Sequence, residues 1–573
     1  MSRFSRRFWV TTAVIIVVLV LLGLTVRGAG RPRRNSLLEV HVTGEIPESA
    51  PAGPFGSFLG TRTLTVLDYV AGIRRARDDR RIRGLILAID GPRVGFAKLQ
   101  ELRDAVRDFQ ASGKWAVAFL ETAGEFAPGN KDYYLATACS SIWVVPSGDV
   151  NLTGLRIEVP FIRGTLDKLG IVPDFDHLGK YKNFMNMITD TAMNAPYRES
   201  MDSIADGLSR QMIQGIAEGR KLTEPRVAAL IDQGPFTGSQ ALQAKLIDHL
   251  GYRDQLDADL KEKNGGALPR ITLGRYLKGG VYYDRGTRVA LIYGVGTVGR
   301  GESGYDPVFS GSSMGATTVA GAIRQAREDR SIKAIILRID SPGGSYIASD
   351  IIWHEVELTR GVKPIVASMS DVAGSGGYFV AMGSDRIIAE PGTLTASIGV
   401  LAGKFVTTGF WSALGITSDA VQRGKHATFY SKGMRYTPEE RAIFESWLQR
   451  IYRDFVQKAA KGRGKSFEAI DAVAQGRVWL GKDAQRLGLV DELGGLPLAI
   501  RRALELAKVD PEGRVNLIEM PRPKGLLRRI LDSGDDTRAA LEALRLRVES
   551  LATDGPGAAP EQVLQMPIVP RID

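Results

Sequence analysis

Two nearly continuous apolar runs, each ending in an aspartate, predict buried strands in the two halves of the chain. Residues 84–90 read GLILAID and residues 334–340 read AIILRID. A polar, arginine-rich helical stretch precedes each run, and a helical stretch and a second apolar run follow it. Continuous apolar runs of this length are typical of strands that are covered on both faces of a sheet. Strands that alternate with helices predict βαβ units and an α/β fold.

The two halves also match each other in sequence. Residues 73–80 (IRRARDDR) align with residues 323–330 (IRQAREDR), and the match continues along the chain at a slowly drifting offset. Short loop insertions would produce such a drift. We therefore predict a first domain at residues 36–265 and a second at residues 285–507, joined by a linker at residues 266–284.

The ends of the chain differ from these two domains. Residues 8–26 form an uncharged apolar stretch of 19 residues, just long enough for a helix to cross a bilayer. The stretch is longer than a usual signal-peptide core, and no good cleavage site follows it, so we predict a retained anchor within residues 1–35 rather than a cleaved signal peptide. Arginines flank it on both sides, so local charge does not set its orientation. Residues 508–573 are predicted to be a partly disordered extension, with a short amphipathic helix at residues 536–551.

Composition excludes some classes of protein. Lys and Arg number 75 against 64 Asp and Glu, but the positive charges are scattered and not interleaved with aromatic residues. We therefore expect no nucleic-acid binding. The single cysteine, Cys139, excludes an intramolecular disulfide and is predicted to be buried.

Each half has lost a reactive residue that the other half keeps. At an offset of 245, Ser375 aligns with Asn130 and Lys182 aligns with Ala427. A serine needs a base to take its proton, and a lysine can be that base when burial lowers its pKa. None of the five histidines lies in a recognisable triad motif, and Ser–Lys pairs are a known variant of the triad. We predict one composite site with Ser375 as nucleophile and Lys182 as base, and we expect neither side chain to be a major core contact.

A second lysine competes with Lys182 for the role of base. Lys180 lies two residues earlier, but its counterpart Lys425 persists in the serine-bearing half. Lys180 is therefore the less discriminating candidate.

Glycine-rich turns surround the predicted nucleophile. Ser375 lies in residues 371–378 (DVAGSGGY), which follow a predicted strand and open a helical run. An earlier strand ends in residues 341–344 (SPGG), where backbone N–H groups of Gly343 or Gly344 could stabilise an oxyanion together with that of Gly376. Taken alone, the SPGG segment is better interpreted as an ordinary tight turn. The first half lacks this glycine pair, which favours the functional interpretation.

Ser397 is a further candidate. It lies in residues 395–399 (TASIG), and its counterpart in the first half is Leu152. Its hydroxyl could hydrogen-bond the lysine amine and orient it towards Ser375. A purely structural serine in a turn is an equal alternative.

Taken together, these segments and the GKYK of residues 179–182 resemble the signal peptide peptidase A family, in the long, duplicated form of these membrane-bound Ser–Lys proteases. The resemblance runs from about residue 36 to 507. It implies an α/β fold class with two tandem ClpP/crotonase-like repeats behind one N-terminal transmembrane helix. It also implies roles for the site residues as follows: nucleophile Ser375, base Lys182, oxyanion glycine Gly343 or Gly344, and lysine-orienting residue Ser397. Gly374, Asn183 and Asp340 depart from the usual pattern, and Asn183 makes the positioning of Lys182 less certain.

The resemblance further implies a location and a substrate. We expect a single-pass protein of the bacterial inner membrane with its catalytic part on the periplasmic or extracytoplasmic side. We expect it to hydrolyse extended apolar peptides, above all signal peptides left in the membrane, and to form a homotetramer. No cofactor or metal is required. The alternatives are a non-catalytic membrane scaffold that binds extended peptides and a crotonase-like acyl-transfer enzyme.

Overall fold

The computed structural model of the chain describes residues 31–49, 63–280, 282–306 and 311–521, together with short strands at 564–565 and 571–572. The predicted anchor at residues 8–26 and the predicted helix at residues 536–551 lie outside the described residues. Within the described ranges, no helix has both the length and the apolar character that crossing a bilayer demands.

The first half is built around a six-stranded parallel sheet in the order β10-β1-β2-β3-β4-β9. Its buried strands carry the apolar run predicted at residues 84–90, which lies in β2. The strands are β1 (Ser36–Gly44), β2 (Ile82–Pro92), β3 (Trp115–Leu120), β4 (Ser141–Val144), β9 (His249–Leu250) and β10 (Arg270–Thr272). The helices are α2 (Val66–Asp78), α3 (Phe96–Ala111), α4 (Asn130–Ala136), α5 (Arg163–Lys168), the 3-10 turn η1 (Asn183–Met185), α6 (Asn186–Thr189), α7 (Ala195–Arg220), α8 (Glu224–Gln233), α9 (Gly238–Gln243), α10 (Arg253–Lys263) and α11 (Leu273–Leu277).

The second half is built around an eight-stranded sheet in the order β21-β19-β17-β15-β11-β23, with β18 paired to β17 and β22 paired to β18. All pairs are parallel except β19 with β21. The strands are β11 (Thr287–Val295), β15 (Ala334–Ser341), β17 (Ile365–Gly374), β18 (Arg386–Ala389), β19 (Leu394–Ala396), β21 (Val478–Leu480), β22 (Glu492–Leu493) and β23 (Val515–Met520). The helices are α12 (Ala316–Glu328), α13 (Tyr346–Thr359), α14 (Gly376–Ala381), α15 (Thr408–Ala413), α16 (Pro438–Arg463), α17 (Phe467–Asp471), α18 (Gly481–Arg486) and α19 (Leu496–Leu506).

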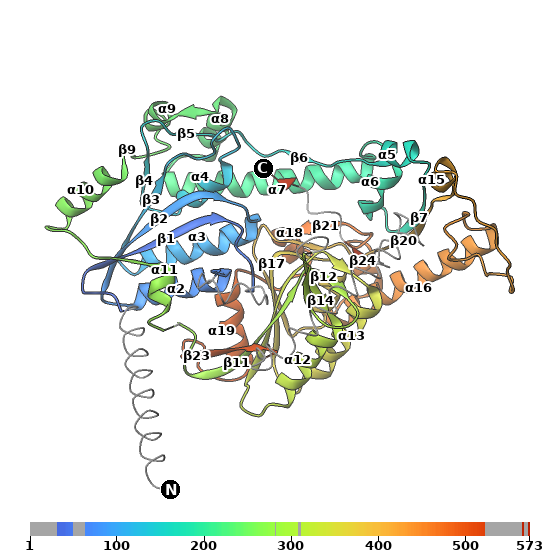
Figure 1. Cartoon of the computed structure of the whole chain (residues 1–573). Coiled ribbons are helices and arrows are strands. Elements are labelled where there is room, and N and C mark those ends of the chain that lie inside the picture. The colour runs from blue at the N-terminus through green and yellow to red at the C-terminus, as the bar shows by residue number, and fades with distance from the viewer. Residues whose placement is uncertain are drawn as a thin grey trace, which may run out of the picture.

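The predicted α/β class is confirmed, because parallel strands alternate with helices in both halves (Figure 1). Cys139 is buried, as predicted. Four described strands fall outside the predicted domains. β10 lies in the predicted linker and pairs with β1, whereas β23, β24 and β25 lie in the predicted extension, where β23 pairs with β11. The domain boundaries themselves remain predictions.

Smaller sheets accompany the two main sheets, and one of them joins the two halves. A five-stranded sheet has the order β13-β14-β12-β16-β24, and an antiparallel ribbon joins β7 of the first half to β20 of the second. The two strands of the tail contact different halves: β24 pairs with β16, and β25 pairs with β6. The strands are β5 (Asp149–Val150), which pairs with β8 (Phe236–Thr237), β6 (Ile157–Glu158), β7 (Val172–Leu178), β12 (Thr297–Gly299), β13 (Gly304–Asp306), β14 (Gly311–Gly315), β16 (Gly343–Gly344), β20 (Val400–Val406), β24 (Leu564–Gln565) and β25 (Arg571–Ile572).

The repeat is visible in side-chain detail. Tyr133 donates its hydroxyl to the carbonyl of Leu246 at 2.7 Å, and Tyr378 donates to the carbonyl of Leu489 at 3.0 Å. The two long helices α7 and α16 both have 26 residues, a side-chain N-cap and a proline in the first turn. Proline is tolerated there because first-turn N–H groups have no acceptor within the helix. The two halves therefore share one scaffold.

Candidate active site

The β7–β20 ribbon joins the two halves, and its strands lie side by side (Figure 1). The strands run antiparallel, and Leu178 at the end of β7 lies opposite Val400 at the start of β20. Lys182 follows the end of β7, and Ser397 precedes the start of β20. The sequence order of an antiparallel pair thus places these two side chains past the same end of the ribbon.

Lys182, Ser375 and Ser397 meet in one buried cluster. The Lys182 Nζ lies 2.7 Å from the Ser375 Oγ, 3.0 Å from the Ser397 Oγ and 3.0 Å from the Ser397 carbonyl oxygen. All three residues are fully buried. The expectation that neither Ser375 nor Lys182 would be a major core contact is wrong for Lys182, which is one of the largest fully buried side chains.

Burial changes the chemistry of the lysine. Removal from water lowers the pKa of Lys182 well below its ordinary value of 10.5, because the charged ammonium form loses its hydration. A lysine amine that is neutral near physiological pH can accept a proton from a neighbouring hydroxyl. The Ser375 hydroxyl is within hydrogen-bond distance for that transfer.

Close backbone packing fixes the lysine segment. A Cβ on Gly476, whose φ is +76°, would lie 2.5 Å from the Lys182 backbone nitrogen, and a Cβ on Gly179 would lie 2.5 Å from the Gln475 carbonyl carbon. The Tyr181 N–H donates to the Gln475 carbonyl at 2.7 Å. Only glycine fits at these two contacts, so a segment of the second half holds in place the lysine that the first half supplies.

Ser375 has a strained backbone conformation. It lies between β17 and α14 with φ +53° and ψ −114°, a region that non-glycine residues rarely adopt. Its N–H donates to the Ala396 carbonyl at 2.7 Å, and its carbonyl accepts from the Phe379 N–H at 2.8 Å. Ser397 also has a positive φ, of +52°. Strain of this kind persists only where surrounding contacts impose it, and it concentrates at functional sites.

The SPGG segment at residues 341–344 (the glycine turn) lies directly against residues 374–377 around Ser375 (the nucleophile turn). A Cβ on Gly376 would lie 3.1 Å from both the Gly343 Cα and the Gly344 nitrogen. The Gly343 N–H already donates to the Ser341 Oγ at 3.2 Å, whereas Gly376 is the first residue of α14, where helix amides lack intrahelical acceptors. The structure therefore brings together the three glycines predicted to hold an oxyanion, and among them Gly376 has its N–H at the start of a helix.

The glycine turn also accepts an extended chain. Gly343 and Gly344 form β16, which pairs in parallel with Val298 on one side. On the other side it pairs antiparallel with β24, Gly343 opposite Gln565 and Gly344 opposite Leu564. Backbone pairing at this edge is thus compatible with a second, extended segment.

Sequence reasoning missed a group of charged side chains behind the two turns. Lys98 of α3 has its Nζ 2.7 Å from the Asp340 Oδ2 and 3.7 Å from the Asp371 Oδ2. Asp340 immediately precedes the SPGG turn, and Asp371 lies four residues before Ser375. Their places beside the two motifs are the only signal in the sequence that could have singled them out.

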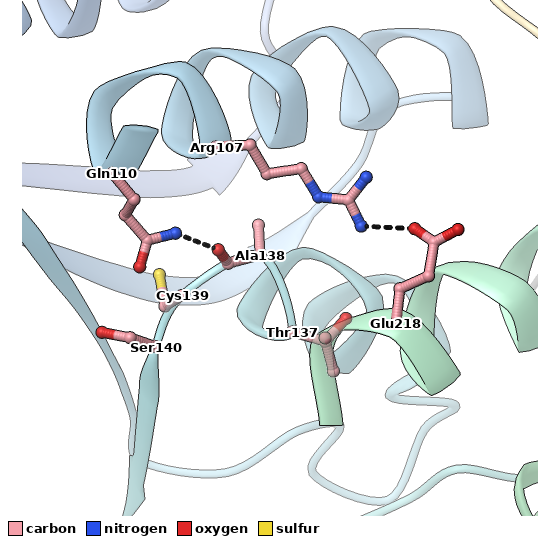
Figure 2. Close-up of a pocket in the computed structure, with 8 residues that line it drawn as sticks. Arg107, Gln110, Thr137, Ala138, Cys139, Ser140 and Glu218 are labelled. Carbon is pink, nitrogen blue, oxygen red and sulfur yellow. Dashed lines mark hydrogen bonds and ion pairs between the residues drawn. The ribbon is translucent and has the colours of Figure 1, made fainter. Parts of the chain in front are cut away.

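Two other features lie apart from the cluster. The Lys180 Nζ contacts the Tyr181 hydroxyl at 3.2 Å and the Glu199 carboxylate at 3.8 Å, and its side chain is 59% exposed. Lys180 therefore lies on the surface, outside the buried cluster. Figure 2 shows a cavity in the first half, where Arg107 pairs with Glu218; Ser375 and Lys182 are not among the residues that line it.

Known proteins resemble this chain over most of its length. The model of "Peptidase family S49" matches residues 123–266 and 357–510, one segment in each half. "Serine protease SPPA, chloroplastic" from Arabidopsis thaliana is 34% identical over 511 residues, which cover 87% of this chain and 73% of that protein. "Protease 4" from Salmonella typhi is 32% identical over 463 residues (78% of this chain, 72% of that protein), and "Protease 4" from Haemophilus influenzae is 28% identical over 468 residues (78% and 73%). Among solved structures, a ClpP1 mutant from Listeria monocytogenes matches 36% of this chain and 92% of its own at 16% identity, with a TM-score of 0.23 that is too low to decide the fold.

Proposed function

Since the chain belongs to peptidase family S49 and is a serine peptidase, we propose that Ser375 is its nucleophile and Lys182 its general base. The observation that carries this proposal is the 2.7 Å contact between the Lys182 Nζ and the Ser375 Oγ. The two residues come from different halves of the chain, and each equivalent position in the other half has lost the reactive group. Side chains that meet only through the folding of two halves are strong candidates for a shared reaction.

The proposed reaction begins with the neutral amine. Lys182 takes the proton of the Ser375 hydroxyl as the Oγ attacks the scissile carbonyl carbon, and the carbonyl oxygen becomes an oxyanion. The N–H groups of Gly344 and Gly376 lie at the turns beside Ser375 and would donate to that oxygen, with Gly343 as a third donor if its bond to Ser341 is released.

The same lysine completes the reaction. The Lys182 ammonium gives its proton to the leaving amine as the C–N bond breaks, which leaves an acyl ester on Ser375. Lys182 then takes a proton from a water molecule as the water oxygen attacks the ester carbon. The bond between that carbon and the Ser375 Oγ breaks, the acyl part of the peptide leaves as a carboxylic acid, and Lys182 returns the proton to the Oγ. Ser397 would orient the amine throughout, because it contacts the Nζ with both its hydroxyl and its carbonyl.

We propose extended apolar peptides, in particular signal peptides, as substrates. The antiparallel pairing of β24 with the glycine turn supports this, because it shows that an extended backbone can lie beside the oxyanion donors. Recognition through backbone hydrogen bonds of a strand edge requires an unfolded substrate segment. Each half is proposed to be a ClpP/crotonase-like repeat, in line with its parallel sheet and helices.

We further propose a bacterial inner-membrane location, with the 19-residue apolar stretch at residues 8–26 as a single-pass anchor and the catalytic part on the extracytoplasmic side. Alkaline washing of membranes should leave the full chain in the pellet and release a chain that starts at residue 36. Release of both would contradict the anchor. The homotetramer is a proposal from the family resemblance, and the mass of the detergent-solubilised protein tests it.

The decisive experiment compares wild type, Ser375→Ala and Lys182→Ala for cleavage of a synthetic apolar signal peptide in detergent. We expect wild-type turnover and a loss of about 10⁴-fold or more in each variant. Lys180→Ala is the matched control and should retain activity, because Lys180 is exposed and contacts Glu199. A folded Ser375→Ala protein that still cleaves the peptide would overturn the assignment.

A second readout separates the enzyme from its alternatives. A fluorophosphonate should label wild type at Ser375 and fail to label Ser375→Ala. A folded wild type that neither reacts with the reagent nor cleaves peptide would instead favour the non-catalytic scaffold, and turnover of a thioester without peptide cleavage would favour acyl transfer.

A further inference from the structure

The helix α3 of the first half begins against the second half, directly behind the nucleophile turn. Its first-turn amides donate to the Asp371 carboxylate: the Gly95 N–H at 2.8 Å and the Lys98 N–H at 3.0 Å. A Cβ on Gly95 would lie 2.4 Å from the Asp371 Cγ, so only glycine allows this approach. A residue of the second half thus caps a helix of the first half, where a negative charge is favourable.

The side chain of Lys98 joins the same contact. Its Nζ lies 2.7 Å from Asp340, 3.7 Å from Asp371 and 3.8 Å from Glu48, and the side chain is 10% exposed. Burial tends to lower the pKa of Lys98, but the attraction of these carboxylates outweighs it and raises the pKa. Lys98 therefore carries a positive charge in a place that little water reaches.

Both aspartates hold an irregular part of the central sheet. In the pairing of β15 with β17, Ile339 lies opposite Met369, but Ser341 already lies opposite Ala373. The extra residues of β17 form a bulge, and the Asp340 Oδ1 accepts the N–H of Val372 within it at 3.1 Å. Bulges re-aim the residues that follow them. Here the residues that follow are the glycine turn on β15 and the nucleophile turn on β17.

A second group of charged side chains, around Arg338, contacts this cluster. Arg338 donates to Glu48 at 2.8 Å and to Glu101 at 2.7 Å, and Glu48 also accepts from the Ser370 hydroxyl in the bulge. Although burial tends to raise it, the pKa of Glu48 is lowered to about 2 by Arg338 and Lys98. Glu48 and Glu101 belong to the first half and Arg338 to the second, so charges from both halves alternate across the contact.

We propose that Lys98 is a positioning residue for peptide hydrolysis: its ammonium fixes Asp340 and Asp371, and through them the glycine turn and the nucleophile turn. This proposal rests on the proposed function. The first half would then supply the base and would also hold the oxyanion donors and the nucleophile of the second half in position. A shift of about 1 Å at such groups can cost about 10²-fold in rate.

The test measures kcat, KM and Tm for Lys98→Met and for the charge-balanced double variant Lys98→Met/Asp340→Asn. Removal of Lys98 alone leaves buried carboxylates uncompensated, which destabilises a protein strongly, whereas removal of both partners of an ion pair is often close to neutral. We expect kcat to fall about 10²-fold in both variants with KM within about twofold of wild type. The double variant should have a Tm close to that of wild type.

Arg103→Met is the matched control. Arg103 is a buried cation on the same helix, but it donates to Thr137 and Gly215 within the first half. Its loss should lower Tm and leave kcat unchanged. The rate of fluorophosphonate labelling of Ser375 should follow kcat in every variant.

Two results would overturn the proposal. One is a folded double variant whose kcat is within about twofold of wild type, which would give Lys98 a stabilising role only. The other is a fall in kcat for Arg103→Met as large as that for Lys98→Met. Should Lys98→Met unfold, the double variant alone decides. Wild-type turnover and its loss in Ser375→Ala, measured alongside, establish the proposed function independently of Lys98.

Discussion

Asn130 and Ser375 occupy equivalent places in the two halves, at the starts of the short helices α4 and α14, but they do different work. The Asn130 side chain accepts the N–H groups of Thr153 and Gly154 at 3.1 and 3.2 Å and donates to the Gly154 carbonyl at 2.8 Å. Ser375 instead has a positive φ and a hydroxyl beside a lysine amine. One half uses the position to stabilise a loop, and the other keeps a serine with a strained backbone there, beside a lysine amine.

The scaffold around these positions has changed much less. Lys114 donates to the carbonyls of Ala76 and Asp79 in the first half, and Lys363 donates to the equivalent pair in the second half. Residue 427, the counterpart of Lys182, is by contrast exposed. These scaffold contacts recur in both halves although the main sheets differ in size, whereas the lysine and the serine each occur once. Duplication has kept the scaffold twice and the Ser–Lys contact once.

The largest expected effect is a loss of turnover when the lysine is transferred from position 182 to the equivalent position 427. Ala427→Lys in a Lys182→Ala background should leave turnover about 10⁴-fold below wild type, because an exposed lysine keeps its ordinary pKa and stays charged. Peptide cleavage by the double variant measures this. Recovery of activity would mean that the two halves are interchangeable for the base.

A second prediction concerns stability and pH. Lys182 has a lowered pKa in the folded state, so the unfolded chain binds an additional proton at pH values between that pKa and 10.5. Burial of the amine therefore costs stability at neutral pH, and the cost disappears as the pH rises towards 10.5. Lys182→Met should be inactive yet raise Tm at pH 7, by about 2–4 °C for each kcal/mol gained.

Thermal unfolding at pH 7 and near pH 10 measures this difference between Lys182→Met and wild type. The gain in Tm should shrink at the higher pH. Lys180→Met is the control, and it should change Tm little at either pH because Lys180 is exposed. An equal gain at both pH values would contradict the lowered pKa.

Asn130→Ala should show the reverse of Ser375→Ala. It removes three hydrogen bonds from a buried side chain and should cost about 1–3 kcal/mol in the free energy of unfolding. Its kcat should equal that of wild type, whereas Ser375→Ala should remain stable and lose turnover. Denaturant unfolding and peptide cleavage on both variants provide the comparison, and a loss of kcat in Asn130→Ala would show that the first-half turn takes part in the reaction.

The smallest expected effect is a loss of unfolding free energy that should be equal in the two halves. Tyr133→Phe and Tyr378→Phe each remove one buried hydroxyl donor from a carbonyl, at a cost of about 1 kcal/mol. Equal changes in the free energy of unfolding would show that the scaffold is energetically as well as geometrically repeated. A much larger cost for Tyr378→Phe would indicate that the nucleophile turn depends on that bond.

The reciprocal losses in the sequence pointed to the central residues. Alignment of the halves singled out Lys182, Ser375 and Ser397, and the structure places all three in one contact. The apolar runs at residues 84–90 and 334–340 predicted central strands because burial on both faces leaves an unbroken apolar pattern. An apolar run is a local pattern, and a reciprocal loss appears when one half is aligned with the other, so both can be detected in the sequence alone.

Contacts between the halves could not be predicted in this way. The pair Lys98 and Asp340 joins residues more than two hundred positions apart, and neither half contains a repeated copy of the pair that a comparison could detect. The clamp of Gly476 on Lys182 depends equally on how the halves dock. The extent of the domains was also hard to predict, since β10 has only three residues and the apolar run of β23 (VNLIEM) is interrupted by Asn516 and Glu519.

The fusion of both halves in one chain has a consequence for dilution. If the halves were separate proteins, Lys182 and Ser375 would meet only at concentrations near or above the dissociation constant of the two halves, and a scarce protein would lose its site. A linker of modest length holds two tethered partners at an effective concentration on the order of millimolar. Lys182 and Ser375 are joined by such a tether, so each newly folded molecule carries a complete pair however few copies the cell contains.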